Sequence, residues 1–521
     1  MVDLTRTVSA LSAQSRCAAL PSTFITPGLA SIETQYVTGG TNVSLPNVGI
    51  DCLGTFNMAA GEIYAPQNLC FASLSINTTS TSTNRVAMWL PDNWNGRFLG
   101  TGTAGLSGCV DYPGLSYGAS LNFAAAGTDA GHTGVTGAAF LNAPEVFTDF
   151  ASRGVHLEAV VGKQIIETYY GLQPSYSYYS GCSGAAGMGS MRQRCNFPDD
   201  FDGILAGAPA VNGVNLFAWF ALVSKPFMAT EPGVMTSASW GLVRNETMKQ
   251  CDHLDGAVDG TISYPEDCKF DPATLLCSAT QPQPDCLNAA QVDGLKQLYG
   301  DMYDPTGQFF FPHYNAGAEL SNPTLFIVIS GVMVPMSFFT YQAWSNVVYS
   351  DPTWPGTNFT WSDIAAGQVK LAEIETWTGD LRAFKGRGGK LITTHGTEDT
   401  LIPAGVSTRQ HAMTAAATGK HDMDDWYALY LVPGLNHCVN MGSVATGAWK
   451  FGQLGTVPEP RAASNDSEHN ALLALVDWVE KGKDPKKLVG MTDTGETREV
   501  CRYPSQGRWI KGKWKCGPRH Q

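Results

Sequence analysis

Hydrophobic positions along the chain follow helical spacing in some segments and strand-like runs in others. Residues 152–170 carry apolar side chains at helical spacing, and Gly171 and Pro174 mark the end of this predicted helix. The segments SYSYYS (175–180) and FDGILAGAPA (201–210) are typical of strands. Because strands alternate with helices, the pattern predicts an α/β fold with a doubly wound parallel sheet.

The alternating pattern stops after the second of these strands. Residues 213–388 are rich in Trp, Phe, Pro and Cys and show no clear alternation, until GGKLITTHG (388–396) resumes a buried strand. A further strand and an amphipathic helix (467–482) follow. We therefore expect residues 1–212 and 389–521 to form one domain, with residues 213–388 inserted into it as a lid domain.

Composition and charge exclude several classes of protein. With 43% hydrophobic and 15% charged residues, the chain can bury a core and is not disordered. A net charge of -13 without a basic run argues against nucleic acid or an anionic membrane as a partner. The longest apolar stretch, 325–339, is interrupted by Pro335 and is shorter than the roughly 20 residues of a membrane span. We expect a soluble protein.

Thirteen cysteines and five N-glycosylation sequons indicate a secreted, extracellular protein. The sequons are at Asn42, Asn77, Asn245, Asn358 and Asn465. Three pairs are close in sequence and are expected to form disulfides: Cys251 with Cys268, Cys277 with Cys286, and Cys501 with Cys516. The cysteine spacing does not suit zinc. The first residues lack the apolar core of a signal peptide, so we expect that a leader is missing from this sequence.

A candidate nucleophile follows the strand at 175–180. The sequence Gly181-Cys182-Ser183-Gly184-Ala185 leads from this strand into a segment of small residues. Strand, tight turn and helix are the context of a nucleophile elbow, although the last position of G-x-S-x-G is alanine here. The alternative is a plain turn of small residues.

Candidate partners of Ser183 follow in the order acid, then histidine. Asp399 comes after the strand KLITTHG, and His437 comes after the strand WYALYLVPG. Carboxyl ends of parallel strands meet at one edge of a sheet. There, a histidine can take the proton of the serine while the acid fixes its tautomer. Glu398 is the alternative acid, and we favour Asp399.

Two cysteines flank this candidate triad. Cys182 precedes Ser183, and Cys438 follows His437. A disulfide between them would hold the two catalytic loops together and stabilise the fold by about 5 kcal/mol in the chain-entropy model. The alternative is a pair of unrelated structural cysteines.

These motifs resemble the tannase and feruloyl esterase family, whose signature is Cys-Ser, Asp and His-Cys. Similar blocks extend over nearly the whole chain: WNGRFLGTGTAGLSG, GTDAGH, FPDDFDGILAGAPA, HGTEDTLIP, PGLNHC and LVDWVEKG. The resemblance implies an α/β-hydrolase core with a large inserted lid, and a secreted serine carboxylesterase acting on esters of phenolic acids.

We expect a feruloyl esterase that releases hydroxycinnamic acids from small esters or feruloylated polysaccharide fragments of the plant cell wall. A tannase that hydrolyses galloyl esters is the first alternative. A non-catalytic, secreted glycan-binding glycoprotein on the same scaffold is the alternative from another class, and a serine peptidase is a third. The sequence does not predict the oligomeric state.

The oxyanion hole is expected to use backbone N–H groups of Gly184 and of the loop at Gly102 and Thr103, because two donors must face the tetrahedral oxygen. The chain departs from the family at both places. Residues 184–187 read GAAG where a polar residue and two glycines are expected, and the loop GTGTAG contains fewer glycines than usual.

A metal site is expected in the insertion. Residues 251–262, CDHLDGAVDGTI, place Asp252, Asp255 and Asp259 on a turning loop. Carboxylates suit calcium, although the spacing is not that of an EF-hand. The resemblance implies a structural calcium held by these three side chains and by the carbonyls of Ala257 and Ile262. No catalytic cofactor is expected.

We expect the remaining cysteines and histidines to have structural roles. We pair Cys17 with Cys70 and Cys52 with Cys109, although four cysteines allow three connectivities. Cys195 is expected to be the unpaired thiol. His132 and His395 are interpreted as packed or hydrogen-bonded histidines. The aromatic residues of the insertion are assigned mainly to its core, with a phenolic pocket as the alternative.

Overall fold

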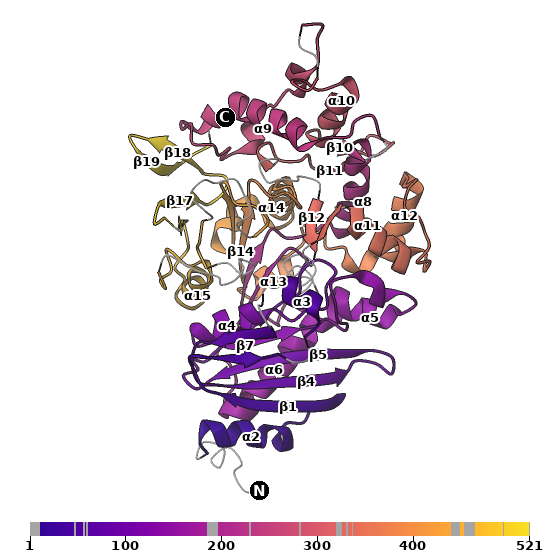
Figure 1. Ribbon diagram of the computed structural model, residues 1–521. Coiled ribbons are helices and arrows are strands. Elements are labelled where there is room, and N and C mark those ends of the chain that lie inside the picture. Colours follow the sequence, from indigo (N-terminus) through magenta and orange to yellow (C-terminus); the bar gives the residue numbers. More distant parts are fainter. Residues whose placement is uncertain are drawn as a thin grey trace.

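A nine-stranded sheet extends from one end of the molecule, at β1, to its middle, at β14 (Figure 1). The computed structural model describes residues 11–45, 48–55, 58, 61–184, 196–228, 231–280, 283–318, 326–329, 332–335, 337–438, 449–452, 464–492 and 494–519. The strand order is β1-β4-β5-β7-β6-β8-β9-β14-β15. The strands are β1 (Leu29–Val37), β4 (Leu69–Asn77), β5 (Thr83–Pro91), β6 (Arg97–Thr101), β7 (Ala124–Thr128), β8 (Tyr176–Cys182), β9 (Gly203–Gly207), β14 (Lys390–Gly396) and β15 (Tyr427–Val432).

The sheet is mixed rather than wholly parallel. The strands from β7 to β15 in this order run parallel, as the alternating pattern predicts. In contrast, β1, β4 and β5 are antiparallel to their neighbours. The prediction of a parallel sheet is therefore wrong for this edge, where β4 and β5 follow one another directly and pair as an antiparallel hairpin. The α/β fold is confirmed, and the carboxyl ends of the parallel strands lie along one edge.

Helices cover both faces of the sheet. On one face, α4 (Tyr112–Ser120) and α15 (Ala471–Lys481) share a core with inward side chains such as Leu99 and Leu205. On the other face, α2 (Ala13–Thr23) and α6 (Gly154–Tyr170) pack against the alternate positions, such as Phe98 and Ile204. The predicted helix at 152–170 is α6, and Gly171 ends it with a φ of +77°.

The segment between β9 and β14 packs around a hydrophobic core that it shares with residues 140–151, Ile402 and Val406. None of its described residues joins the nine-stranded sheet. Its buried residues include Trp219, Leu295, Phe311 and Trp344. Its α-helices are α8 (Gly213–Ser224), α9 (Ser237–Cys251), α10 (Ala289–Leu298), α11 (Ser337–Ala343), α12 (Trp361–Lys370) and α13 (Arg382–Gly386). Its strands are β10 (Met302–Tyr303), β11 (Phe309–Phe311), β12 (Phe326–Ile329) and β13 (Val332–Pro335). Figure 1 shows α9 and α10 at the opposite end of the molecule from β1. Its role as a lid stays a prediction.

Smaller elements complete the fold. They are α3 (Ile50–Thr55), α5 (Pro144–Thr148), α14 (Gly405–Thr418), β2 (Thr41–Ser44), β3 (Glu62–Ala65), β16 (Lys487–Met491), β17 (Thr497–Cys501), β18 (Gln506–Ile510) and β19 (Lys513–Gly517). In the part of the chain that the structure describes, every helix is too short or too polar to cross a membrane.

The six expected cysteine pairs are all bonded in the structure. The pairs are Cys17–Cys70, Cys52–Cys109, Cys182–Cys438, Cys251–Cys268, Cys277–Cys286 and Cys501–Cys516. Cys195, the expected unpaired thiol, lies outside the described residues. The five sequon asparagines are exposed, so each could accept a glycan, and their use stays a prediction.

Candidate active site

Ser183 lies in a tight turn directly after β8. Its φ is +62°, a left-handed conformation that is costly for a residue with a Cβ atom. The N–H of Ser183 donates to the carbonyl of Gly207 (2.9 Å), and its own carbonyl accepts from the N–H of Ala210 (3.1 Å). The end of β9 therefore fixes the turn. A strained turn between a strand and a helix is the geometry of a nucleophile elbow. Residues 185–195, Ala185 included, lie outside the described residues.

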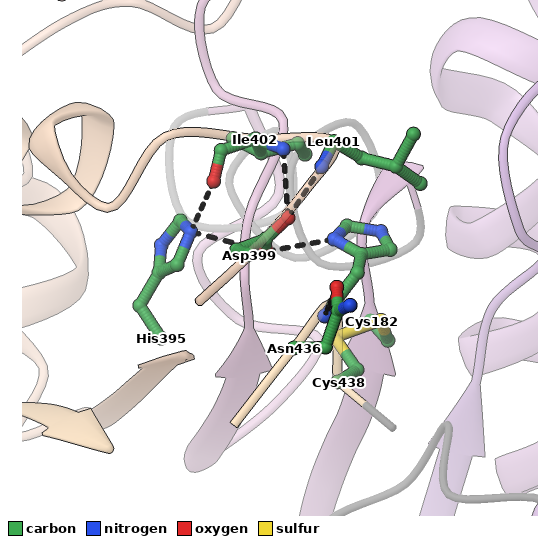
Figure 2. Close-up of a disulfide and its surroundings, with 8 residues drawn as sticks. Cys182, His395, Asp399, Leu401, Ile402, Asn436 and Cys438 are labelled. Atoms are coloured by element: carbon green, nitrogen blue, oxygen red, sulfur yellow. Dashed lines mark hydrogen bonds and ion pairs between the residues drawn. A yellow bond between two sulfur atoms is a disulfide. The ribbon is translucent and has the colours of Figure 1, made fainter. Parts of the chain in front are cut away.

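Asp399 is fully buried in the loop after β14 and accepts hydrogen bonds at both carboxylate oxygens. Oδ1 accepts from the N–H groups of Leu401 and Ile402, each at 2.8 Å (Figure 2). Oδ2 lies 2.8 Å from Nδ1 of His437. Burial alone would raise the pKa of Asp399, but the charge of His437 and the hydrogen bonds from both neighbouring histidines outweigh it. The pKa stays below its usual range, so the carboxylate is ionised.

His437 follows β15 and turns one ring nitrogen to the acid. With Nδ1 donating to Asp399, the neutral imidazole leaves Nε2 unprotonated and able to accept a proton. Nε2 is buried and has no hydrogen-bond partner among the described residues. This is the arrangement of a general base whose orientation is fixed by a carboxylate.

The disulfide Cys182–Cys438 joins the elbow to the histidine loop (Figure 2). Its Cα atoms are 6.2 Å apart, and 256 positions of sequence separate the two cysteines. A ring nitrogen of His437 and both sulfur atoms lie within 4.8 Å of one another. The bridge therefore connects the residues next to Ser183 and His437, and neither sulfur is a free thiolate that could bind a metal.

His395 contacts the acid from the other side, a role that the sequence interpretation missed. Its ring is fully buried, with Nε2 2.8 Å from the carbonyl of Ile402 and 3.3 Å from Oδ2 of Asp399. Nδ1 lies 2.7 Å from the hydroxyl of Ser407. A proton on Nε2 serves both acceptors, while the Ser407 hydroxyl donates to Nδ1. His395 therefore donates to the oxygen that also binds His437. The sequence feature that could have indicated this role is the position of His395 four residues before Asp399, near the end of the buried strand β14.

The expected oxyanion donors follow neighbouring strands. β6 pairs with β8 up to Thr101 and Ser180, so Gly102 and Thr103 continue β6 beside the elbow. Gly184 is the first helical residue after Ser183. Behind the loop, the buried carboxyl of Glu158 accepts from the N–H of Thr101 (2.9 Å), and burial raises the pKa of Glu158 well above its usual value. The Glu158 carboxyl thus holds the start of the loop. The identity of the donors stays a prediction.

The three aspartates of the expected calcium loop follow α9, inside the loop closed by the disulfide Cys251–Cys268. Asp252 and Asp255 are buried, and Asp259 is more exposed. The carboxylate of Asp252 accepts from the N–H of Gly260 (3.1 Å), and that of Asp255 accepts from the N–H of Ala257 (3.0 Å). These bonds shape the loop and leave further oxygen lone pairs for a cation.

The electrostatics of this loop fit a divalent cation. Burial raises the pKa of Asp259, and the positive charge of Arg498 lowers it in part. The negative charges of Asp255 and Asp252 raise it again. A calcium ion would relieve this repulsion between carboxylates. The carbonyl of Ile262 accepts from the hydroxyl of Thr397 (3.3 Å) and keeps a second lone pair. The calcium ion itself stays a prediction.

Comparisons with known proteins show the family of the chain. The family model for tannase and feruloyl esterase matches residues 74–519. A probable feruloyl esterase B-1 from Neosartorya fischeri is 35% identical and aligns over 98% of this chain and 97% of its own length. A probable feruloyl esterase B-2 from Aspergillus flavus is 36% identical over 91% of this chain and 90% of its own.

Solved structures share the fold. The crystal structure of feruloyl esterase B from Aspergillus oryzae has a TM-score of 0.88 at 33% identity and covers 97% of this chain and 100% of that chain. The tannin acyl hydrolase from Aspergillus niger has a TM-score of 0.74 at 22% identity, with 98% and 95% covered, and shows the fold alone. The chain belongs to the tannase and feruloyl esterase family.

Proposed function

We propose that the chain is a secreted serine carboxylesterase that releases hydroxycinnamic acids of the ferulic type from plant cell-wall esters. The observation that carries the proposal is the hydrogen bond between Asp399 and His437, together with the disulfide that joins the His437 loop to the elbow of Ser183. The feruloyl esterase B relatives, matched over nearly the whole chain, support the substrate class.

The reaction follows from the roles of these groups. Ser183 Oγ attacks the ester carbonyl while Nε2 of His437 takes the serine proton, and Asp399 stabilises the imidazolium that forms. The same proton goes to the leaving alcohol, which gives an acyl-enzyme that water hydrolyses. The N–H of Gly184 and one from Gly102 or Thr103 stabilise the tetrahedral oxyanion.

An aromatic surface beside the oxyanion loop suits the phenolic ring of the acid. Phe339, on α11, is half-buried and lies against Gly105, where an added Cβ would come within 3.2 Å of its ring. Phe339 stacks on Phe217 of α8, with ring centroids 5.8 Å apart and planes at 9°. Trp219 and Trp344, by contrast, are fully buried in the insertion's core. We place the aromatic ring of the substrate against Phe339.

Secretion and a structural calcium ion belong to the same proposal. Six disulfides and five exposed sequon asparagines suit an oxidising, extracellular environment. The calcium ion would be held by Asp252, Asp255 and Asp259 with the carbonyls of Ala257 and Ile262. It has no part in the reaction, because a serine nucleophile and its base require no metal.

The test is hydrolysis of methyl ferulate, caffeate, p-coumarate, sinapate and gallate by the wild type and by Ser183→Ala. Faster cleavage of the cinnamates than of gallate, with an inactive but folded variant, is the expected result. Preference for gallate would make the enzyme a tannase. Absence of turnover on all five esters would overturn the proposal and favour a non-catalytic glycan-binding protein.

A further inference from the structure

A polar hollow lies on the sheet face formed by the three antiparallel strands, away from the catalytic residues. Its volume is about 390 Å³, within the range of small-molecule sites. Side chains of β1, β4 and β5 form its floor, and Tyr112 of α4 and residues 44, 45 and 48 lie around it. In Figure 1 these strands lie at the end of the molecule opposite α9 and α10. The proposed ester hydrolysis does not use these residues.

The strand register places hydrogen-bonding side chains together on this face. Glu33 of β1 pairs with Ser73 of β4, and two pairs further along, on the same face, Gln35 is opposite Phe71. Glu33 and Gln35 are exposed, Ser73 is half-buried, and none of these three side chains has a partner among the described residues. They offer donors and acceptors that a ligand can use.

Arg85 connects the hollow to the catalytic edge of the sheet. Arg85 on β5 is opposite Ser75 of β4. The backbone N–H of Arg85 donates to Oδ1 of Asp129, the residue after β7, at 2.8 Å. Between β5 and the strand that leads to Ser183 lie only β7 and β6. At about 4.8 Å per strand, the hollow begins roughly 15 Å from the proposed nucleophile.

The chemistry of the hollow favours a neutral, hydroxyl-rich ligand. The lining holds one negative side chain, Glu33, and one positive side chain, Arg85, and the net charge of -13 on the chain repels an anionic polymer. Phe71 packs edge-on against Tyr112, with ring centroids 6.2 Å apart, and adds an apolar surface at one end. Hydroxyl, amide and carboxylate groups beside an aromatic ring suit the alternating polar and C–H surfaces of a sugar.

We propose that this hollow binds the neutral glycan chain of a polymeric substrate while the phenolic ester lies at Ser183. The inference rests on the proposed function and adds a second binding site to it. The hollow begins roughly 15 Å from the proposed nucleophile, and Glu33 and Gln35 lie two strands further away, on β1. Only a substrate with several sugar units past the ester therefore reaches both sites. A small ester therefore reports on the catalytic site alone.

The test compares a long and a short substrate in two variants of the hollow. Glu33→Ala combined with Gln35→Ala removes two exposed polar groups, and Ser73→Phe fills the floor. Glu167→Ala is the control, because Glu167 is an exposed residue of α6, on the other face of the sheet. Kinetics are measured with methyl ferulate and with a feruloylated arabinoxylan oligosaccharide of about six sugar units.

Both variants should raise KM for the oligosaccharide about five- to tenfold, as expected for the loss of one or two hydrogen bonds. In both variants, kcat and KM for methyl ferulate should stay at wild-type values. In the Glu167→Ala control, kcat and KM for both substrates should stay at wild-type values. An unchanged KM for the oligosaccharide in both variants would overturn the proposal.

A binding experiment separates this proposal from the proposed function. The de-esterified oligosaccharide is titrated calorimetrically into Ser183→Ala, with and without Ser73→Phe. Binding that Ser73→Phe abolishes would support the hollow even if the wild type hydrolysed no ester. Absence of binding, or preference for an oligogalacturonide of equal length, would reject a neutral glycan site.

Discussion

Removal of the bridge between Cys182 and Cys438 should lower activity more than stability alone explains. The variant is Cys182→Ala combined with Cys438→Ala. The bridge closes a loop of 256 positions, for which the chain-entropy model gives a stabilisation of about 5 kcal/mol. Its loss also frees the residues next to Ser183 and His437 to move apart. Since a misplacement of about 1 Å can cost 10²-fold in rate, we expect kcat to fall on the order of 10²-fold.

The matched control is the bridge Cys277–Cys286 in the insertion. It closes a separation of only 9 positions, so its removal should cost about 2.5 kcal/mol. Turnover of methyl ferulate at 25 °C and thermal unfolding are measured for both double variants and the wild type. We expect kcat to stay within about twofold in the control, because that bridge adjoins no catalytic residue. A Cys182/Cys438 variant that is folded at 25 °C and has wild-type kcat would show that the bridge does not position Ser183 and His437.

Three further predictions concern other residues. His395→Ala should lower kcat about tenfold with little change in KM, because Asp399 loses one charge-assisted hydrogen bond. Partial recovery of kcat in His395→Gln would separate this hydrogen bond from a packing role of the ring. Burial raises the pKa of Asp111, the N-cap of α4, to about 6. The protonated Asp111 carboxyl therefore contributes its full stabilisation of the fold below about pH 4, and this stabilisation is lost as pH rises through 6. Relative to the wild type, the free energy of unfolding of Asp111→Asn should rise by up to about 3 kcal/mol between pH 4 and 7. A Tm difference between the two proteins that is constant over this range would contradict a raised pKa of Asp111. Chelation with EDTA should lower Tm, with activity at 25 °C retained while the protein is folded and Tm restored by calcium; an unchanged melting curve would count against the metal site.

Much of the candidate site could be predicted from the sequence because its signals are local. The elbow of Ser183 follows a strand within a few residues, and Asp399 and His437 each follow a buried strand. Parallel pairing then brings the ends of these strands to one edge, so their order along the chain is enough. The disulfide could be inferred because its cysteines are direct neighbours of Ser183 and His437.

Features that depend on tertiary contacts could not be predicted. The role of His395 follows from a loop that folds back, so that Ile402 and Asp399 meet the same ring nitrogen. The antiparallel edge and its polar hollow depend on the register of β1, β4 and β5. That register brings Glu33, Ser73 and Arg85 together across more than 50 positions of sequence. Their polar pattern along each strand is typical of an ordinary exposed sheet face.

Covalent labelling tests the proposed nucleophile, Ser183, most directly. A fluorophosphonate reacts with an activated serine, and the serine oxygen displaces fluoride from phosphorus. The protein is labelled, digested and mapped by mass spectrometry, with His437→Ala and heat-denatured protein as controls. We expect a single label on Ser183 in the native wild type and none in either control. A label on another serine, or no label on a protein that hydrolyses methyl ferulate, would contradict this expectation.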